Sequence, residues 1–350
     1  MRWVASATIR SCKQWRDWLG PRLAWALLGA AATGWPLAGF AQQTAKPARI
    51  VLLSDHVWGR FSSERAAPFR QRLRELGWVE GKNIVFEERH AATEEQRKQI
   101  AAEMERLPPE VIYACPPCSL QAGPSGRAPI RGVPIVFMYS DPVGAKMVKS
   151  LAHPGGNLTG FAFQGQDLDA KRLQLLKELI PALVRVGVLV MKNHLQRDRM
   201  VADLQVAASK LNVTLQLFEI AGDEPAERID AAFEAMSRDG TQAVLGLTGA
   251  HFSREHQRIA GLVLKYRLPG IFSAGPRVEI GALMTYDANF LDLTRRMAGL
   301  VDKILKGAKP SEIPIEQPNS FEFAINLGIA KKIGLKIPQS ILLRADRVIE

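Results

Sequence analysis

The sequence predicts an α/β protein with two lobes, each built on a parallel sheet. From Arg49 onward, short apolar runs alternate with amphipathic stretches of helical spacing, which is the pattern of right-handed βαβ units. The alternation occurs about five times before residue 162 and about five times after it, with no low-complexity linker between the halves. The length of 350 residues also suits two domains, since one domain takes roughly 150 residues.

In the first half, short apolar runs predict strands and stretches of helical spacing predict helices. The expected strands are Ile50–Leu53, Ile84–Glu88, Val111–Ala114, Val133–Met138 and Leu158–Phe161. The expected helices are Arg65–Leu76, which ends before Gly77, and Glu94–Arg106.

The second half repeats this pattern. The expected strands are Val186–Val190, Thr214–Phe218, Ala243–Leu247, Gly270–Phe272 and Ala282–Thr285. The expected helices are Ala170–Leu179, Arg197–Leu211, Ala226–Met236, Ser253–Tyr266 and Leu291–Leu305. In open α/β sheets, ligands bind at the carboxyl ends of the strands, so two such lobes side by side predict a shared binding cleft.

The first 41 residues have the features of a secretory signal peptide. Basic side chains come first, the apolar stretch Leu23–Ala32 follows, and small residues at Gly39 and Ala41 precede the polar Gln42. The apolar stretch is short for a membrane span, although an uncleaved anchor helix is the alternative. We expect cleavage near Ala41 and release of the mature chain into the periplasm.

Composition excludes several classes of protein. Hydrophobic residues make up 47% and charged residues 23% of the chain, which excludes a disordered, collagen-like or multi-span membrane protein. The formal net charge is +11, but residues 1–41 carry +4 of it and the remainder forms no Lys/Arg cluster longer than three. We therefore expect a solvated basic surface and no nucleic-acid partner.

The sequence contains no recognisable catalytic motif. It lacks Walker A and Gly-x-Ser-x-Gly patterns, and the glycine-rich segment Gly155–Gly160 leads into an expected strand instead of following one. His251 and His256 flank Glu255 without the spacing of a zinc protease, so we expect no metal site. No Ser or Cys nucleophile is paired with a His at recognisable spacing. We therefore expect neither an enzyme nor a cofactor.

Cys115 and Cys118 are the only cysteines of the expected mature chain, because Cys12 lies in the leader. They form the motif Cys-Pro-Pro-Cys directly after an expected strand. In an oxidising compartment this pair can close a tight disulfide. It can also leave two free thiols that line a pocket, or carry redox chemistry of the thioredoxin type. These alternatives stay open.

Several motifs occur in order along residues 48–350 and carry a family resemblance. They are Leu73–Asn83 (LRELGWVEGKN), Pro134–Phe137 with Asp141–Gly144, His153–Gly160, Ala170–Leu179, Ile304–Pro310, Ile325–Leu327 and Arg344–Glu350. Together they resemble a family of ABC-transporter substrate-binding proteins that are often of the tryptophan/tyrosine type.

This resemblance implies the fold of a type I periplasmic binding protein, in which two Rossmann-like lobes joined by a three-segment hinge close on a small ligand. We then expect lobe one over residues 48–162 plus 276–316, lobe two over 163–275, and a C-terminal crossover segment over 317–350. The chain is expected to cross near Phe161–Asp167, to return near Ser273–Gly281 and to cross again near the C-terminus.

Polar residues at or just after the expected strand ends are the candidate ligand-binding residues. They are Ser54, Asp55, Trp58, Cys118, Ser119, Ser140, Asp141, Thr248, Gly249, Ser273 and Tyr286. Asp141 suits a ligand ammonium group, and free N–H groups of the helix expected to begin at Cys118 attract a carboxylate. The serines can instead cap helices, and Tyr286 can instead belong to the core.

The resemblance implies a small-molecule ligand, an amino acid or related carboxylate, and an ABC permease of the inner membrane as partner. We expect a monomer. The sequence departs from the family at Cys115–Cys118, near Ala274, and at Asp287, where the family usually has Gly after the Tyr. The alternatives are a ligand sensor that docks on a membrane receptor and an exported thiol–disulfide redox protein that uses the cysteine pair. A DNA-binding regulator of this fold is excluded, because the leader occupies the place of its helix-turn-helix.

Overall fold

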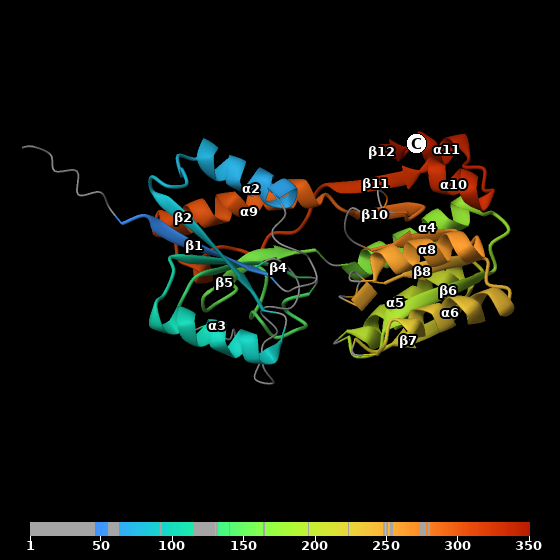
Figure 1. Ribbon diagram of the computed structural model, residues 1–350, viewed down its shortest axis with the longest axis horizontal. Coiled ribbons are helices and arrows are strands. Elements are labelled where there is room, and N and C mark those ends of the chain that lie inside the picture. The colour runs from blue at the N-terminus through green and yellow to red at the C-terminus, as the bar shows by residue number, and fades with distance from the viewer. Residues whose placement is uncertain are drawn as a thin grey trace, which may run out of the picture. The chain divides into compact units, whose positions relative to one another are not determined.

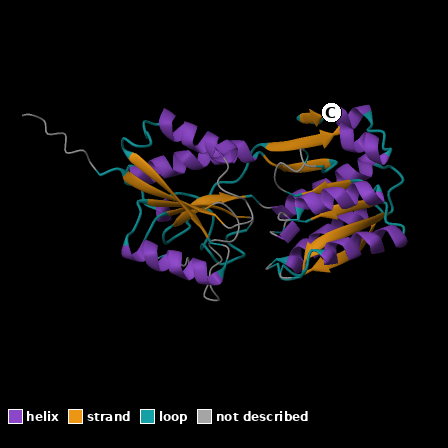
Figure 2. Cartoon of the chain, viewed as in Figure 1, coloured by secondary structure: helices purple, strands orange, loops and turns teal. Residues whose placement is uncertain are grey.

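The computed structural model describes residues 46–350 except 55–62, 92, 115–129, 131, 140, 164, 195, 223, 248, 250, 253–254, 274–277 and 279–280. Its strands form two sheets with helices packed against them (Figures 1 and 2). The predicted α/β class with two mainly parallel sheets is therefore confirmed. The expected leader lies outside the described residues.

The first sheet has five strands in the order β2-β1-β3-β4-β5, and every pairing is parallel. The strands are β1 (Ala48–Ser54), β2 (Ile84–His90), β3 (Val111–Ala114), β4 (Ile135–Tyr139) and β5 (Leu158–Ala162). Apolar side chains along β1 alternate between the two faces: Ile50 and Leu52 join one apolar cluster, whereas Val51 and Leu53 join the other. The near-continuous apolar runs of these strands follow from this burial on both faces.

Helices cover both faces of the first sheet. The helices α2 (Ser63–Glu75) and α9 (Phe290–Leu305) pack side by side on one face, and α3 (Glu94–Arg106) lies on the opposite face (Figure 1). Leu293 and Met297 of α9 are buried with Phe69 of α2. We call this sheet with its three helices the first lobe.

The second sheet has seven strands in the order β12-β11-β10-β9-β8-β6-β7. They are β6 (Arg185–Met191), β7 (Thr214–Ile220), β8 (Ala243–Gly246), β9 (Gly270–Phe272), β10 (Met284–Ala288), β11 (Phe321–Asn326) and β12 (Arg347–Ile349). Only the β10–β11 pairing is antiparallel among the described pairs.

The helices that share one apolar cluster with the second sheet form, together with it, what we call the second lobe. They are α4 (Gly165–Leu179), α5 (Arg197–Lys210), α6 (Glu227–Arg238), α8 (His256–Tyr266), α10 (Leu327–Ile333) and α11 (Gln339–Leu342). The amphipathic spacing of the first four made them predictable, although α8 begins three residues later than the expected Ser253. The sequence did not predict α10, α11, β11 or β12.

The chain passes between the lobes three times. It leaves the first lobe after β5 and enters α4, returns from β10 into α9, and leaves again between Glu316 and β11. The return therefore lies at Ala288–Phe290 and not at the expected Ser273–Gly281, because β10 hydrogen-bonds with β9 and extends the second sheet. Likewise, residues 321–349 complete the second sheet as β11 and β12, although we expected only a crossover segment there.

None of the helices that the structure describes is both long and apolar enough to cross a membrane. In the same part of the chain, no group of three or more His, Cys, Asp or Glu side chains could hold a metal ion.

Candidate functional site

The carboxyl ends of β1 and β2 bring a serine and a histidine together. Ser54 and His90 are the last residues of these strands, and the parallel register pairs them directly. The Oγ of Ser54 lies 2.7 Å from Nδ1 of His90, and Ser54 is only 2% exposed. The histidine ring itself is exposed. The sequence analysis did not select His90. The signal that could have identified it is that His90 follows the apolar run of β2 in the same way as Ser54 ends the apolar run of β1.

Asp141 follows β4 and binds groups from both lobes. Its Oδ1 accepts a hydrogen bond from the backbone N–H of Gly144 at 2.7 Å. Its Oδ2 accepts one from Nε2 of Gln196 at 2.6 Å and lies 3.4 Å from NH1 of Arg199. Gln196 and Arg199 come from the start of α5 in the second lobe. The sequence predicted the position of Asp141 at a strand end but not these two partners.

Next to Gln196 lies a half-buried histidine. The backbone N–H of Gln196 donates to Nδ1 of His194 at 3.2 Å, so Nδ1 is the acceptor nitrogen of this ring. Burial lowers the pKa of His194, because a charged imidazolium loses hydration. His194 is therefore neutral at pH 7.

Two predicted residues lie at the carboxyl ends of strands in the second lobe. Ser273 directly follows β9, is 2% exposed, and donates its backbone N–H to Gly246 at 3.1 Å. Gly249 lies beyond β8 and is buried. A Cβ at Gly249 would overlap the side chain of Met191 and lie 3.2 Å from the ring of Phe252. Close packing therefore explains a glycine at this strand end.

Tyr286 lies within β10, where its ring packs on β11. The ring stacks on Phe321 at a centroid distance of 6.0 Å and meets Phe323 edge-on at 6.3 Å. Its backbone carbonyl accepts a hydrogen bond from the Nε of Arg172 in α4 at 2.9 Å. These contacts match the structural alternative for Tyr286, in which the ring belongs to the packing of the sheet.

The remaining predicted site residues lie outside the described residues. They are Asp55, Trp58, Cys115, Cys118, Ser119, Ser140 and Thr248. The described ones form separate groups: Ser54 with His90, and Asp141 with Gln196 and Arg199. Hydroxyl, imidazole, carboxylate and amide groups at strand ends can bind the carboxylate and the ammonium group of a small zwitterion through hydrogen bonds.

Comparison with known proteins gives one family and one curated relative. The family described as ABC transporter substrate binding protein matches residues 63–349. The curated relative, a tyrosine-binding protein of Clostridioides difficile strain R20291, is 26% identical over 273 residues, which cover 77% of this chain and 76% of the relative.

Solved structures share the fold. A conserved domain protein from Vibrio cholerae has a TM-score of 0.76 at 23% identity, covering 87% of this chain and 100% of its own. An ABC domain from Streptococcus pneumonia in complex with L-Trp has a TM-score of 0.75 at 21% identity, with the same coverages of 87% and 100%.

Proposed function

Because the chain belongs to the ABC transporter substrate binding protein family, we propose that it captures an amino acid or a related carboxylate and delivers it to an ABC permease for import. The family match supports this proposal most directly, because it covers every strand of both sheets except β1. As a member of a family of binding proteins, the chain is not an enzyme, as the lack of a catalytic motif predicted.

The proposed ligand is an aromatic or similar small amino acid. The curated relative is named for tyrosine, and one solved structure of the same fold contains L-Trp. In the first lobe, the buried hydroxyl of Ser54 can donate to Nδ1 of His90, which places the proton of the ring on the exposed Nε2. That N–H is a donor suited to a ligand carboxylate.

The proposed place of capture is the periplasm. Basic residues, a short apolar stretch and small residues before Gln42 support export with cleavage near Ala41. Mass spectrometry of protein taken from the periplasm is expected to find a chain that begins at Gln42 or Gln43. A mature chain that still begins at Met1 would contradict the proposed cleavage.

A ligand screen tests the proposed function. The protein is unfolded and refolded to remove bound molecules, and its melting temperature is measured with L-tyrosine, L-tryptophan, other amino acids and aromatic carboxylates. A ligand at about 100 times its Kd stabilises the folded state by about 2.7 kcal/mol, which raises the melting temperature by several degrees.

Matched histidine variants connect this binding to the site. His90→Ala is expected to weaken the shift that the ligand causes, because it removes the proposed carboxylate donor. His153→Ala is the control, since this exposed histidine lies in a loop and its described bonds with Ser150 involve only its backbone. Equal ligand shifts in both variants would refute the role of His90. The absence of any active ligand, together with no molecule co-purified with native protein, would refute the carrier function.

A further inference from the structure

We infer that Asp141 joins the two lobes directly and stabilises the closed form of the protein before any ligand binds. This inference rests on the proposed function, because opening and closing of lobes is how a carrier would admit its ligand. We call the contacts of Asp141 with Gln196 and Arg199 the Asp141 bridge.

The bridge consists of one strong contact and one weaker contact. The carboxylate accepts from the amide of Gln196 at 2.6 Å, and hydrogen bonds to an ionised acceptor are about twice as strong as neutral ones. Asp141 is shielded from water, with 16% of its side chain exposed. Arg199 is 64% exposed and lies 3.4 Å away, so water and salt screen most of its attraction. The Gln196 contact therefore carries most of the bridge.

Asp141 is held ready for this contact by its own turn. Its Oδ1 accepts the backbone N–H of Gly144, and its backbone carbonyl accepts the N–H of Ala145 at 3.0 Å. These two bonds fix the direction of the carboxylate before the second lobe approaches. Little side-chain entropy is then lost when the bridge forms.

Gly144 leaves the space that the bridge needs. A Cβ at this position would overlap Oδ2 of Asp141 and lie 3.0 Å from Nε2 of Gln196. The glycine is thus placed where a side chain would separate the two bridging groups. This observation is independent of the hydrogen bonds, and it points to the same contact.

The bridge also changes the part that Asp141 plays toward a ligand. Both carboxylate oxygens already accept protein donors, so a ligand ammonium group would have to compete with Gln196 for Oδ2. Asp141 then acts as a positioning residue for closure, and not as the ammonium partner that the sequence predicted. A ligand of the carrier would gain affinity from the bridge, because the binding-competent closed form is populated in advance.

The test measures closure without a ligand. Refolded, ligand-free protein is studied by small-angle X-ray scattering, and Gln196→Ala is expected to have a larger radius of gyration than the unmodified protein. Loss of a hydrogen bond to a charged group shifts the closed-to-open ratio by roughly tenfold. Gln174→Ala is the matched control, because the side chain of Gln174 bonds only Lys171 and Glu178 of its own helix among the described contacts.

A second pair of variants tests the space at Gly144. Gly144→Ala is expected to expand the ligand-free protein as Gln196→Ala does, whereas Gly299→Ala is expected to leave it unchanged. Apart from its chain neighbours and the backbone of its own helix, no described atom lies within 4 Å of a Cβ at Gly299. Circular dichroism spectra that match that of the unmodified protein at the temperature of the scattering experiment exclude unfolding as the cause.

The outcomes separate the bridge from the carrier function. Equal radii of gyration for Gln196→Ala, Gly144→Ala and the unmodified protein overturn the bridge, whatever the ligand screen finds. Expansion of both variants supports the bridge even if no ligand is found, because the scattering uses none. A cationic ligand whose affinity is lost in Asp141→Asn but kept in Gln196→Ala would return Asp141 to the role of ammonium partner.

Discussion

Arg172 in α4 donates from its Nε to the backbone carbonyl of Tyr286 in β10 at 2.9 Å. The same guanidinium binds Asp169 at 2.5 Å and Asp287 at 3.0 Å, and its side chain is 0% exposed. The helix α4 follows the first passage between the lobes, and β10 precedes the second. One buried cation therefore joins the segment at which the chain enters the second lobe to the segment from which it leaves that lobe. Asp287, at a position where the family resemblance predicts glycine, forms an ion pair with Arg172.

Replacing Arg172 by methionine is expected to destabilise the protein by about 3–5 kcal/mol, because it leaves buried carboxylate charge without its partner. Urea unfolding measures the loss. Arg228→Met is the control, since Arg228 is 59% exposed and meets Glu224 only at 3.8 Å. Its replacement should cost less than about 1 kcal/mol. Similar losses in the two variants would contradict the structural role of Arg172.

The stability of the protein should depend on pH through Asp169. Burial raises the pKa of this carboxyl to about 6, against the attraction of Arg172. Its Oδ2 is buried and accepts no hydrogen bond from the residues that the structure describes. Between roughly pH 4 and pH 6 the folded chain thus holds the proton that the unfolded chain has lost. The protonated carboxyl of Asp169 therefore contributes to the free energy of unfolding below about pH 4, and this contribution is lost as the pH rises through 6.

Asp169→Asn should remove this dependence, because an amide does not titrate. The difference in unfolding free energy between the unmodified protein and the variant is measured in urea at pH 4.5 and at pH 7. We expect the unmodified protein to lose about 2 kcal/mol relative to the variant over this interval. A difference that stays constant with pH would show that Asp169 does not titrate there.

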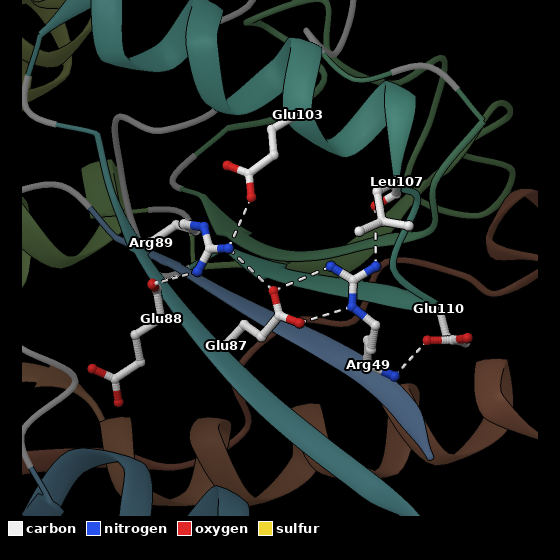
Figure 3. Close-up of polar contacts among 7 residues, drawn as sticks. All are labelled: Arg49, Glu87, Glu88, Arg89, Glu103, Leu107 and Glu110. Carbon is white, nitrogen blue, oxygen red and sulfur yellow. Dashed lines mark hydrogen bonds and ion pairs between the residues drawn. The ribbon is translucent and has the colours of Figure 1, made fainter. Parts of the chain in front are cut away.

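Glu87 lies at the centre of an ion-pair network on the first sheet (Figure 3). Its carboxylate accepts two hydrogen bonds from the guanidinium of Arg49, at 2.8 and 3.1 Å, and one from that of Arg89 at 3.2 Å. The hydrogen bond from Arg49 holds the pKa of Glu87 below its usual range. Its stabilising contribution is therefore present above the unfolded pKa of roughly 4.3 and is lost as the pH falls.

Glu87→Gln is expected to cost about 1–3 kcal/mol at pH 7, because a neutral amide loses the paired bonds with Arg49. Glu103→Gln is the control: its side chain is 39% exposed and makes one hydrogen bond among the described residues, with Arg89 at 2.9 Å. Its replacement should cost less than about 1 kcal/mol. Urea unfolding at low and at high salt compares them, and a greater loss for Glu103→Gln would contradict the central position of Glu87.

Gly160 in β5 is expected to tolerate no side chain. Its φ is +154°, and a Cβ would overlap the backbone oxygen of Phe137 in the neighbouring strand. Gly160→Ala should therefore destabilise the first lobe by more than about 3 kcal/mol or prevent its folding. Gly299→Ala, in the middle of α9, should instead stabilise by about 0.5–1 kcal/mol. Thermal unfolding of both variants checks this: the melting temperature should fall for Gly160→Ala and rise for Gly299→Ala.

Most elements of the chain were predictable, because helices and strands have different apolar periods. Val111–Ala114 and Gly270–Phe272 begin and end where we expected them. The short strands β11 and β12 were not predicted. Both lie at one end of the second sheet, and five of their nine residues are exposed or half-buried. Their apolar pattern is correspondingly weak.

The sequence by itself determined the α/β class, the position of most strands and helices, and the polar residues at strand ends such as Ser54 and Asp141. Only the tertiary structure decided that β10 joins the second sheet. It also decided that Arg172 contacts Tyr286 and Asp287, which follow it in the sequence by 114 and 115 positions. It also decided that Asp141 meets Gln196, 55 positions away. Apolar periodicity reports the environment of each segment along the chain, whereas these pairings depend on the path by which distant segments meet, which no local pattern encodes.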